Sequence, residues 1–257
     1  MTGFFVKKAF FDGWDNLIAL VLLNLGFIAL LSAAYLVLTA MSVSIVLGLT
    51  AALLWLFLLQ VYSGGVSFFT CQFASYQRPS AKELVQYGKE ALRYVPLMTG
   101  LSLMLLLVLF VVIPFYLATP GLFAAVSVAI VFWAMLFLGL SMLYYYPVAA
   151  QMNDRPVKVL KKSMILVLDN LGFSLFLLVH TGITLALSLL TAFMIPGISS
   201  ILMSHQVAVK LRLYKYDYLE QNPEASKRDI PWEALLMDDR DKIGHRTLRG
   251  MIFPWKE

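Results

Sequence analysis

Three long stretches without a charged residue constrain this chain more than any other feature. No Asp, Glu, Lys or Arg occurs in residues 17–77, 94–153 or 171–209. A helix needs about 20 apolar residues to cross a bilayer, so each stretch has room for one or two crossings. The runs are continuously apolar rather than alternating, which argues against a β-barrel. The sequence therefore predicts an all-α fold, a polytopic transmembrane helical bundle.

Composition agrees with this fold class. The 257 residues are 60% hydrophobic and only 14% charged, whereas soluble domains are about a quarter charged. The net charge of +5 comes with Lys and Arg gathered between the apolar stretches, which is the pattern of cytoplasmic loops. We therefore expect no nucleic-acid partner, and we expect both termini to be cytoplasmic.

Turn-forming residues divide the three stretches into six expected spans. The last span is short, so five spans with a re-entrant segment is the alternative. Gly64-Gly65 predicts a close approach of another helix. The expected spans are about 17–38, 42–71, 96–117, 122–148, 171–194 and 198–213, with uncharged turns near 39–41, 119–121 and 196–197.

A basic amphipathic segment, which we call an elbow, precedes each pair of spans, at residues 2–16, 80–94 and 157–170. Lys7-Lys8 stands before Asp15-Asn16 at the same spacing as Lys161-Lys162 before Asp169-Asn170. Ser80 with Glu83 forms a capping box that predicts a helix start. Residues 1–213 are thus predicted to contain three modules, each an elbow followed by a helical hairpin.

The first elbow is predicted to have an apolar and a polar side. At 100° per residue, Phe10 and Trp14 fall on the apolar side, together with Phe4 and Phe11. Lys8, Asp12 and Asp15 fall on the other side. The segment is thus predicted to be a helix in the membrane interface, with a simple lead-in to the first span as the alternative.

Residues 214–257 are predicted to form a cytoplasmic tail. Trp232, Leu235 and Leu236 give a short helix there an apolar side, and Arg246 and Arg249 precede Trp255. A solvated disordered tail is poor in such residues, so we expect docking. Its target is the membrane surface, the protein's own elbows or a partner.

No catalytic, cofactor or metal motif is present. The sequence has no HExxH, CxxC or GxSxG motif and no glycine-rich phosphate loop. Cys71 is the single cysteine and is expected to be a plain buried thiol. We therefore expect no enzyme activity, no cofactor and no metal site.

Two groups of residues remain as site candidates. His180, His205, Asn24 and Gln60 form a possible intramembrane polar site, since ionisable groups in a membrane are often functional. No acidic residue lies in the spans with them, so interhelical hydrogen bonding is the simpler expectation. A possible partner or membrane surface consists of Lys158, Lys161, Lys162, Arg246, Arg249 and Trp255.

Two segments carry a family resemblance. They read KKAFFDGWDNLIALVLLNLGFIALL and VKVLKKSMILVLDNLGFSLFLLV. With the elbow and hairpin modules, they make residues 1–215 resemble the YesL-like family of small bacterial membrane proteins. The resemblance implies the bacterial cytoplasmic membrane and an accessory role, because family members are often encoded beside carbohydrate ABC transporters. The family has no established activity and no site residues to carry over.

Two functional hypotheses follow. The first is a non-enzymatic accessory or scaffold subunit of a membrane complex, in contact with membrane lipids and with other subunits such as ABC transporter components. The second is a small transporter or lipid-handling protein with a pathway between the modules. The second predicts a polar cavity near His180 and His205, lined by Asn24 or Gln60.

Overall fold

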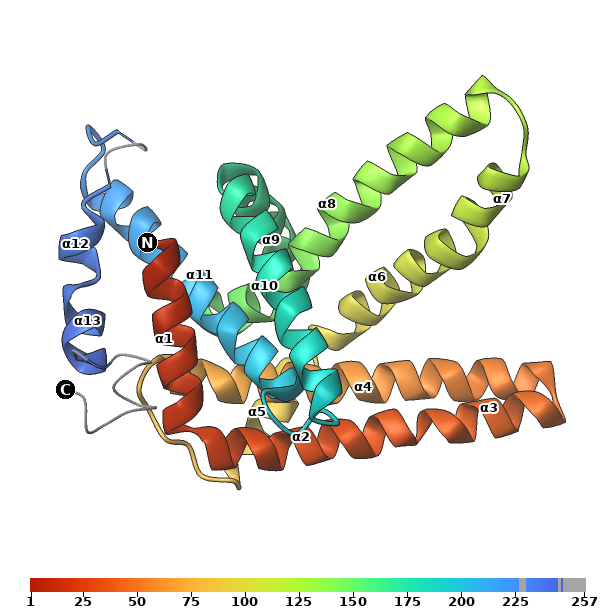
Figure 1. Ribbon diagram of the computed structural model, residues 1–257, viewed down its shortest axis with the longest axis horizontal. Helices are drawn as coiled ribbons and strands as arrows, with labels where there is room; N and C mark the ends of the chain where they lie inside the picture. Colours follow the sequence, from red (N-terminus) through yellow and green to blue (C-terminus); the bar gives the residue numbers. More distant parts are fainter. Residues whose placement is uncertain (227–229, 245, 247–257) are drawn as a thin grey trace.

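The computed structural model describes residues 1–226, 230–244 and 246, and the fold is 84% helix without strands in the described part. All-helical architecture is thus confirmed. The elements, shown in Figure 1, are α1 (Thr2–Asp15), α2 (Leu17–Ser32), α3 (Ala34–Val43), α4 (Ile45–Ala74), α5 (Glu83–Ala91), α6 (Val95–Leu107), a π-helical turn (Val108–Val112), α7 (Ile113–Ala118), α8 (Leu122–Met152), α9 (Pro156–Asp169), α10 (Leu171–Leu190), α11 (Gly197–Gln221), α12 (Trp232–Leu235) and α13 (Met237–Ile243).

Five helical segments among the described residues are long and apolar enough to cross a membrane. Two of them merge shorter elements: α2 with α3, and α6 with the π-helical turn and α7. Their length and composition are compatible with a multi-pass membrane protein. The segments are Leu17–Val43, Ile45–Ala74, Val95–Ala118, Leu122–Met152 and Leu171–Leu190.

The first hairpin, α2–α3 with α4, turns later than predicted. We expected the turn at 39–41, but the helix continues to Val43 and Ser44 is the extended residue (φ −159°, ψ 138°). The hydroxyl groups of Thr39 and Ser42 donate to carbonyls three residues earlier, so neither residue breaks the helix. Gly48 then allows the two arms to meet closely beside Met41.

The second hairpin pairs α6 and α7 with α8. Its turn lies at 119–121 as predicted, and Gly121 there adopts a positive φ of 118°. The helix α8 runs past the expected end of its span near 148, through Pro147 to Met152.

The third hairpin pairs α10 with α11 and departs from the predicted boundaries. The helix α10 ends at Leu190, four residues before the expected end, and α11 continues to Gln221 rather than ending near 213. The expected tail therefore begins inside α11. This helix packs against α1, α2, α4, α8 and α10, which makes it the central element of the fold.

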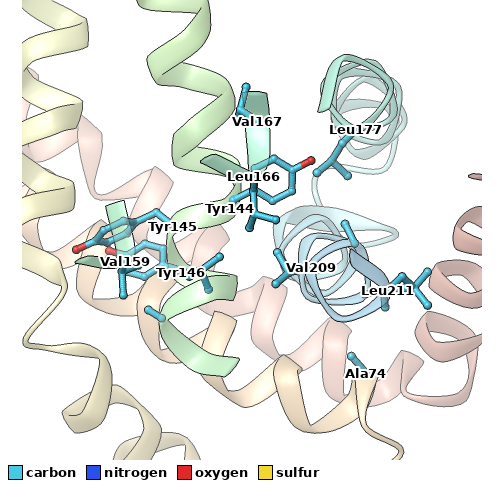
Figure 2. Packing of buried hydrophobic residues seen from close by; sticks show 14 of the residues in the cluster. Ala74, Tyr144, Tyr145, Tyr146, Val159, Leu166, Val167, Leu177, Val209 and Leu211 are labelled. Carbon is cyan, nitrogen blue, oxygen red and sulfur yellow. The ribbon is translucent and has the colours of Figure 1, made fainter. Parts of the chain in front are cut away.

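The core lies at one end of the hairpins, which we call the base, where the elbows are also found. Figure 2 shows Val209 and Leu211 of α11 near Tyr144 of α8 and Leu177 of α10. Away from the base the two long hairpins diverge, as Figure 1 shows. Their outer ends carry exposed apolar residues such as Leu36 (66% exposed) and Leu122 (81%).

The three elbows form helices close to the expected positions. The helices α1 and α9 both end in the Asp-Asn pairs noted in the sequence. The backbone N–H and the hydroxyl of Ser80 both donate to the Glu83 carboxylate, at 2.9 and 2.8 Å, although regular helix begins only at Glu83. Gly64-Gly65 permits the close approach that we predicted, because a Cβ on Gly65 would lie 3.1 Å from the Cα of Gly88 in α5.

The structure buries residues from both predicted sides of α1. Lys8 and Asp12 are buried, at 0% and 3% exposed, whereas Trp14 is 52% exposed and Phe10 is also exposed. The reason is tertiary: α1 lies against α11 and α4, and its buried Lys8 is paired with Asp12 and with Asp239 of α13. Phe5, Ala9 and Phe11 are buried beside these charges, whereas Phe10 and Trp14 face outward.

Candidate functional site

Buried charges from distant parts of the chain meet at the base. The Lys8 ammonium in α1 lies 2.9 Å from Asp12 and 3.6 Å from Asp239 in α13. Lys210 in α11 lies 3.7 Å from the same Asp239 oxygen, and the Tyr76 ring stacks below Lys8 at 3.8 Å. We call these five residues, Lys8, Asp12, Tyr76, Lys210 and Asp239, the charge cluster.

Aromatic groups complete the charge cluster. Tyr76 also faces Lys242 at 4.7 Å and Lys210 at 5.1 Å, so three cations surround one ring. The Tyr214 hydroxyl donates to Asp239 Oδ2 at 3.0 Å. The cluster therefore joins α1, the segment after α4, α11 and α13.

Local structure explains how the chain places these groups. Lys8 and Asp12 are one helical turn apart, which brings their side chains together. After α4 ends at Ala74, Tyr76 adopts a positive φ of 61°, and Lys210 donates to the free Ala74 carbonyl at 2.8 Å. The lysine thereby caps the C-terminus of α4.

Burial and charge act in opposite directions on the two carboxyl groups. Burial raises the pKa of Asp12 to about 6, although Lys8 acts to lower it. Burial also acts to raise the pKa of Asp239, but Lys8 and Lys210 outweigh it and hold that pKa below its usual value. Asp239 therefore stays ionised to lower pH than Asp12 does.

Sequence reasoning missed this cluster. A Lys-Asp pair at i and i+4 within the aromatic α1 was a usable signal, because buried charges are normally paired. Nothing in the sequence indicates that Asp239 is the third partner, since the contact joins residues more than two hundred positions apart.

The elbow lysines lie at the corner between α8 and α9. Lys158 and Lys162 both donate to Asp154, at 2.9 and 2.5 Å, whereas Lys161 is exposed. The hydrogen bonds from Lys162 and Lys158 hold the pKa of Asp154 below its usual value. Arg93, from the end of α5, donates to the backbone carbonyls of Asn153 and Asp154 at 2.8 and 3.0 Å.

Asn24 in α2 serves the turn of the third hairpin. Its side-chain amide donates to the carbonyls of Met194 and Pro196, at 3.0 and 2.9 Å. Its carbonyl oxygen accepts from the backbone N–H and the hydroxyl of Ser199, at 2.9 and 2.8 Å. All four hydrogen-bonding positions of this buried amide are therefore used to hold α2 against the α10–α11 turn.

Gln60 and a second glutamine, Gln206, connect helices in the same way. Gln60 donates to Ser102 at 3.0 Å and accepts from Tyr146 at 3.1 Å, which links α4, α6 and α8. Gln206 of α11 is fully buried, donates to Ser67 and accepts from Gln151 at 2.9 Å. These amides act as interhelical hydrogen bonds, as the simpler expectation proposed.

The two histidines lie between α10 and α11. His205 is 4% exposed and its Nε2 lies 2.8 Å from the Thr181 hydroxyl. His180, half-buried, contacts the Phe5 ring edge to face, with centroids 5.2 Å apart. The structure does not bring Asn24 or Gln60 into contact with them, so the four candidate residues do not form one site.

The described part of the tail docks on the protein's own helices. Leu236 and Ile243 are buried, and Arg212 of α11 lies between the rings of Phe173 and Trp232, at 4.1 and 5.7 Å. Arg246 forms two hydrogen bonds of 2.8 and 3.0 Å from Nη1 to the carboxylate of Asp15. Arg249 and Trp255 lie outside the described residues.

Four cavities among the described residues have linings that do not include the polar candidates. One of about 560 Å³ lies between α1 and α13 and includes Lys7 and Arg240 in its lining. A smaller one of about 190 Å³ lies beside Gln72 and Glu90, and an apolar one of about 170 Å³ lies between α6 and α8. Among the described residues, no group of three or more His, Cys, Asp or Glu is placed to hold a metal ion.

No family model, curated protein or solved structure matches this sequence. The class is nevertheless defined by the fold: an all-helical protein with five membrane-compatible helical segments and a base closed by buried charges. The resemblance to the YesL-like family stays a prediction.

Proposed function

We propose that this protein is a non-enzymatic accessory subunit of a bacterial membrane complex. The observation that supports the proposal is the contrast between a closely packed base and long apolar arms that the rest of the chain leaves uncovered. In Val95–Ala118, none of the most apolar 18-residue window is buried, and in Ile45–Ala74 and Leu122–Met152 only 11% is. Such arms offer large lateral surfaces to lipid and to the helices of other subunits.

The outer half of α8 has a face that suits a partner helix. Ala125 and Ala129 are exposed and lie one turn apart, next to exposed Phe132 and Trp133. Small residues four apart let helix backbones approach closely, and aromatic side chains beside them add contact area. We therefore propose this face as the main contact with a partner.

We further propose six crossings with both termini in the cytoplasm. The helices α1 and α13 are in contact through Lys8 and Asp239, so they must lie on the same side of the membrane. Five crossings would put them on opposite sides. A sixth crossing, by α11, would return the chain to the side of the membrane where α1 lies. The low hydropathy of α11 is tolerable in the membrane because helices of the same chain surround it. The basic elbows then mark the cytoplasmic side.

The resemblance to the YesL-like family supports a carbohydrate ABC transporter as the complex. The alternative of a pathway between modules has less support, because Asn24 and Gln60 already use their amides in hydrogen bonds between helices.

Affinity purification from native membranes, followed by mass spectrometry, tests the proposal. We expect transporter subunits with the wild type and a loss of at least fivefold with Ala129→Leu. The matched control is Ala118→Leu, which changes an exposed alanine on the other arm of the same hairpin. Recovery of the wild-type protein alone would overturn the accessory role, and equal recovery with both variants would overturn the role of the α8 face.

A further inference from the structure

We propose that the outer face of α9, with the corner between α8 and α9, is a binding surface for anionic phospholipids. The inference does not depend on the accessory role and requires only that α10 enters the membrane.

The first observation is the composition of the outer face of α9. Val157, Ile165 and Leu168 are 61%, 58% and 68% exposed, and Lys161 lies among them. The opposite face is buried in the core through Val159 and its neighbours. An exposed face that mixes large apolar side chains with lysine is typical of a helix lying in the membrane interface.

The second observation is continuity with a membrane-compatible helix. Asn170 separates α9 from α10, which begins at Leu171 and is one of the five membrane-compatible segments. Leu171 and Leu175 on α10 are exposed, as Leu168 is on α9. The apolar face of α9 therefore leads directly onto a surface that lies in lipid, which places α9 at headgroup level.

The third observation is an excess of positive charge at this corner. Asp154 is the acceptor for Lys158 and Lys162, and the Arg93 guanidinium is also held against the same turn. Arg155 and Lys161 are exposed, and no described acidic side chain pairs with either. Around this corner the chain carries one carboxylate, Asp154, and five cations: Arg93, Arg155, Lys158, Lys161 and Lys162. The other acid of α9, Asp169, lies at the far end of the helix, next to α10.

The other two elbows carry less surplus positive charge on their exposed faces than α9 does. The exposed face of α1 has Val6, Phe10 and Trp14 but no exposed lysine. The elbow at residues 80–94 exposes Val85, Lys82 and Lys89, but Glu83 and Glu90 offset the charge of those two lysines. The elbow α9 carries three lysines and one aspartate, so it combines an apolar face with a larger surplus of positive charge.

Exposed apolar residues together with surplus positive charge fit one kind of ligand, an anionic phospholipid. A soluble acidic partner would pair with the lysines and leave the apolar residues in water. A neutral helix would cover the apolar residues and leave Lys161 without a counter-ion. Anionic phospholipid supplies acyl chains and a phosphate together, and each Lys or Arg near such a surface strengthens binding roughly fivefold.

The test uses the full-length protein purified in detergent. Its melting temperature is measured with added phosphatidylglycerol, phosphatidylcholine or inorganic phosphate. We expect phosphatidylglycerol to raise the melting temperature more than phosphatidylcholine does, and inorganic phosphate to have little effect. The double variant Arg155→Gln/Lys161→Gln should need at least tenfold more phosphatidylglycerol for the same rise. The matched control, Lys82→Gln/Lys89→Gln on α5, should behave as the wild type.

Three results would overturn the proposal. They are equal effects of the two lipids on the wild type, equal loss in the control variant, and reproduction of the effect by inorganic phosphate. Because Arg155 and Lys161 are exposed, both variants should fold, and Ile165→Ser gives an independent variant that should weaken the response to phosphatidylglycerol through the apolar contact alone.

Discussion

The two lysines and two aspartates of the charge cluster hold the two ends of the described chain together. A buried charge is costly unless it is paired, and in the charge cluster Asp239 is shared by Lys8 and Lys210. The tyrosines Tyr76 and Tyr214 add a cation–π contact and a hydrogen bond. Removing the shared carboxylate therefore affects two cations at once.

We predict that Asp239→Asn destabilises the fold by about 3–5 kcal/mol, because it leaves buried ammonium groups short of counter-ions. The melting temperature should fall, and protease should cut the segment around α12 and α13 more readily. The matched control is Asp238→Asn, the exposed neighbour, which should behave as the wild type. Equal behaviour of the two variants would contradict the role of the cluster.

The buried Asp12 and Asp239 make the stability of the fold depend on pH in opposite directions. The pKa of Asp12 in the folded protein is about 6, above the ordinary value of 3.8, so the folded state binds the proton more tightly. Its contribution to stability therefore rises as pH falls from about 6 to 4. The pKa of Asp239 is lowered, so the stability that its ionised form contributes is lost only below about pH 4.

We predict that lowering the pH from 7 to 4.5 stabilises the wild type relative to Asp12→Asn by about 1–2 kcal/mol. Melting temperatures of both proteins across this pH range provide the measurement. Parallel curves for the two proteins would show that Asp12 does not titrate as the buried site requires.

At the scale of single elements, the turn of the third hairpin is tightly constrained at Gly197. Gly197 begins α11 with a φ of +73°, and a Cβ there would lie 2.0 Å from the Asn24 amide nitrogen. The glycine is therefore required both by backbone conformation and by the close approach of α2.

We predict that Gly197→Ala destabilises the protein by about 2–4 kcal/mol and lowers the yield of folded protein. The comparison is Gly172→Ala in α10, where no atom lies within 4 Å of the added Cβ. Fluorescence-detected size-exclusion chromatography after heating distinguishes the two. Similar profiles would show that Asn24 can move away at little cost.

The existence of the helices could be predicted, but their boundaries and faces could not be predicted fully. Charge-free stretches and turn residues located the hairpins, and Ser80 with Glu83 placed the start of α5 three residues too early. The outward face of α1 could not be predicted, because an amphipathic pattern shows that two faces differ and not which one meets protein. In a membrane protein both water and lipid are outside, so hydrophobicity alone does not decide.

For the whole molecule, six crossings require the three hairpin turns to lie outside the cell. We predict that, in a Cys71→Ser background, Ser44→Cys, Thr119→Cys and Leu190→Cys react with a membrane-impermeant thiol reagent in intact cells. Glu224→Cys, after α11, should react only in permeabilised cells. Reaction of Glu224→Cys in intact cells would contradict the sixth crossing, and protection of Leu190→Cys alone would indicate a re-entrant third hairpin.

Contacts between distant segments were the least predictable part of the molecule. The tail was expected to dock, and its described part does, but the sequence left the surface open among three choices. Hydropathy describes each helix separately and does not indicate which segments are in contact. The pairing of Asp15 with Arg246, for example, joins positions 231 residues apart. Of the candidate polar residues, Asn24 and His205 are buried and Gln60 and His180 are partly buried, and their partners follow only from packing.

The contact between α1 and α13 also has a consequence for biosynthesis. Lys8 and Asp12 leave the ribosome early, whereas Asp239 and Arg246 emerge only after all the spans have been made. Until then Lys8 and Lys210 share no carboxylate other than Asp12. Chains released before residue 239 therefore retain an unclosed base, with buried cations accessible to water and to quality-control proteases.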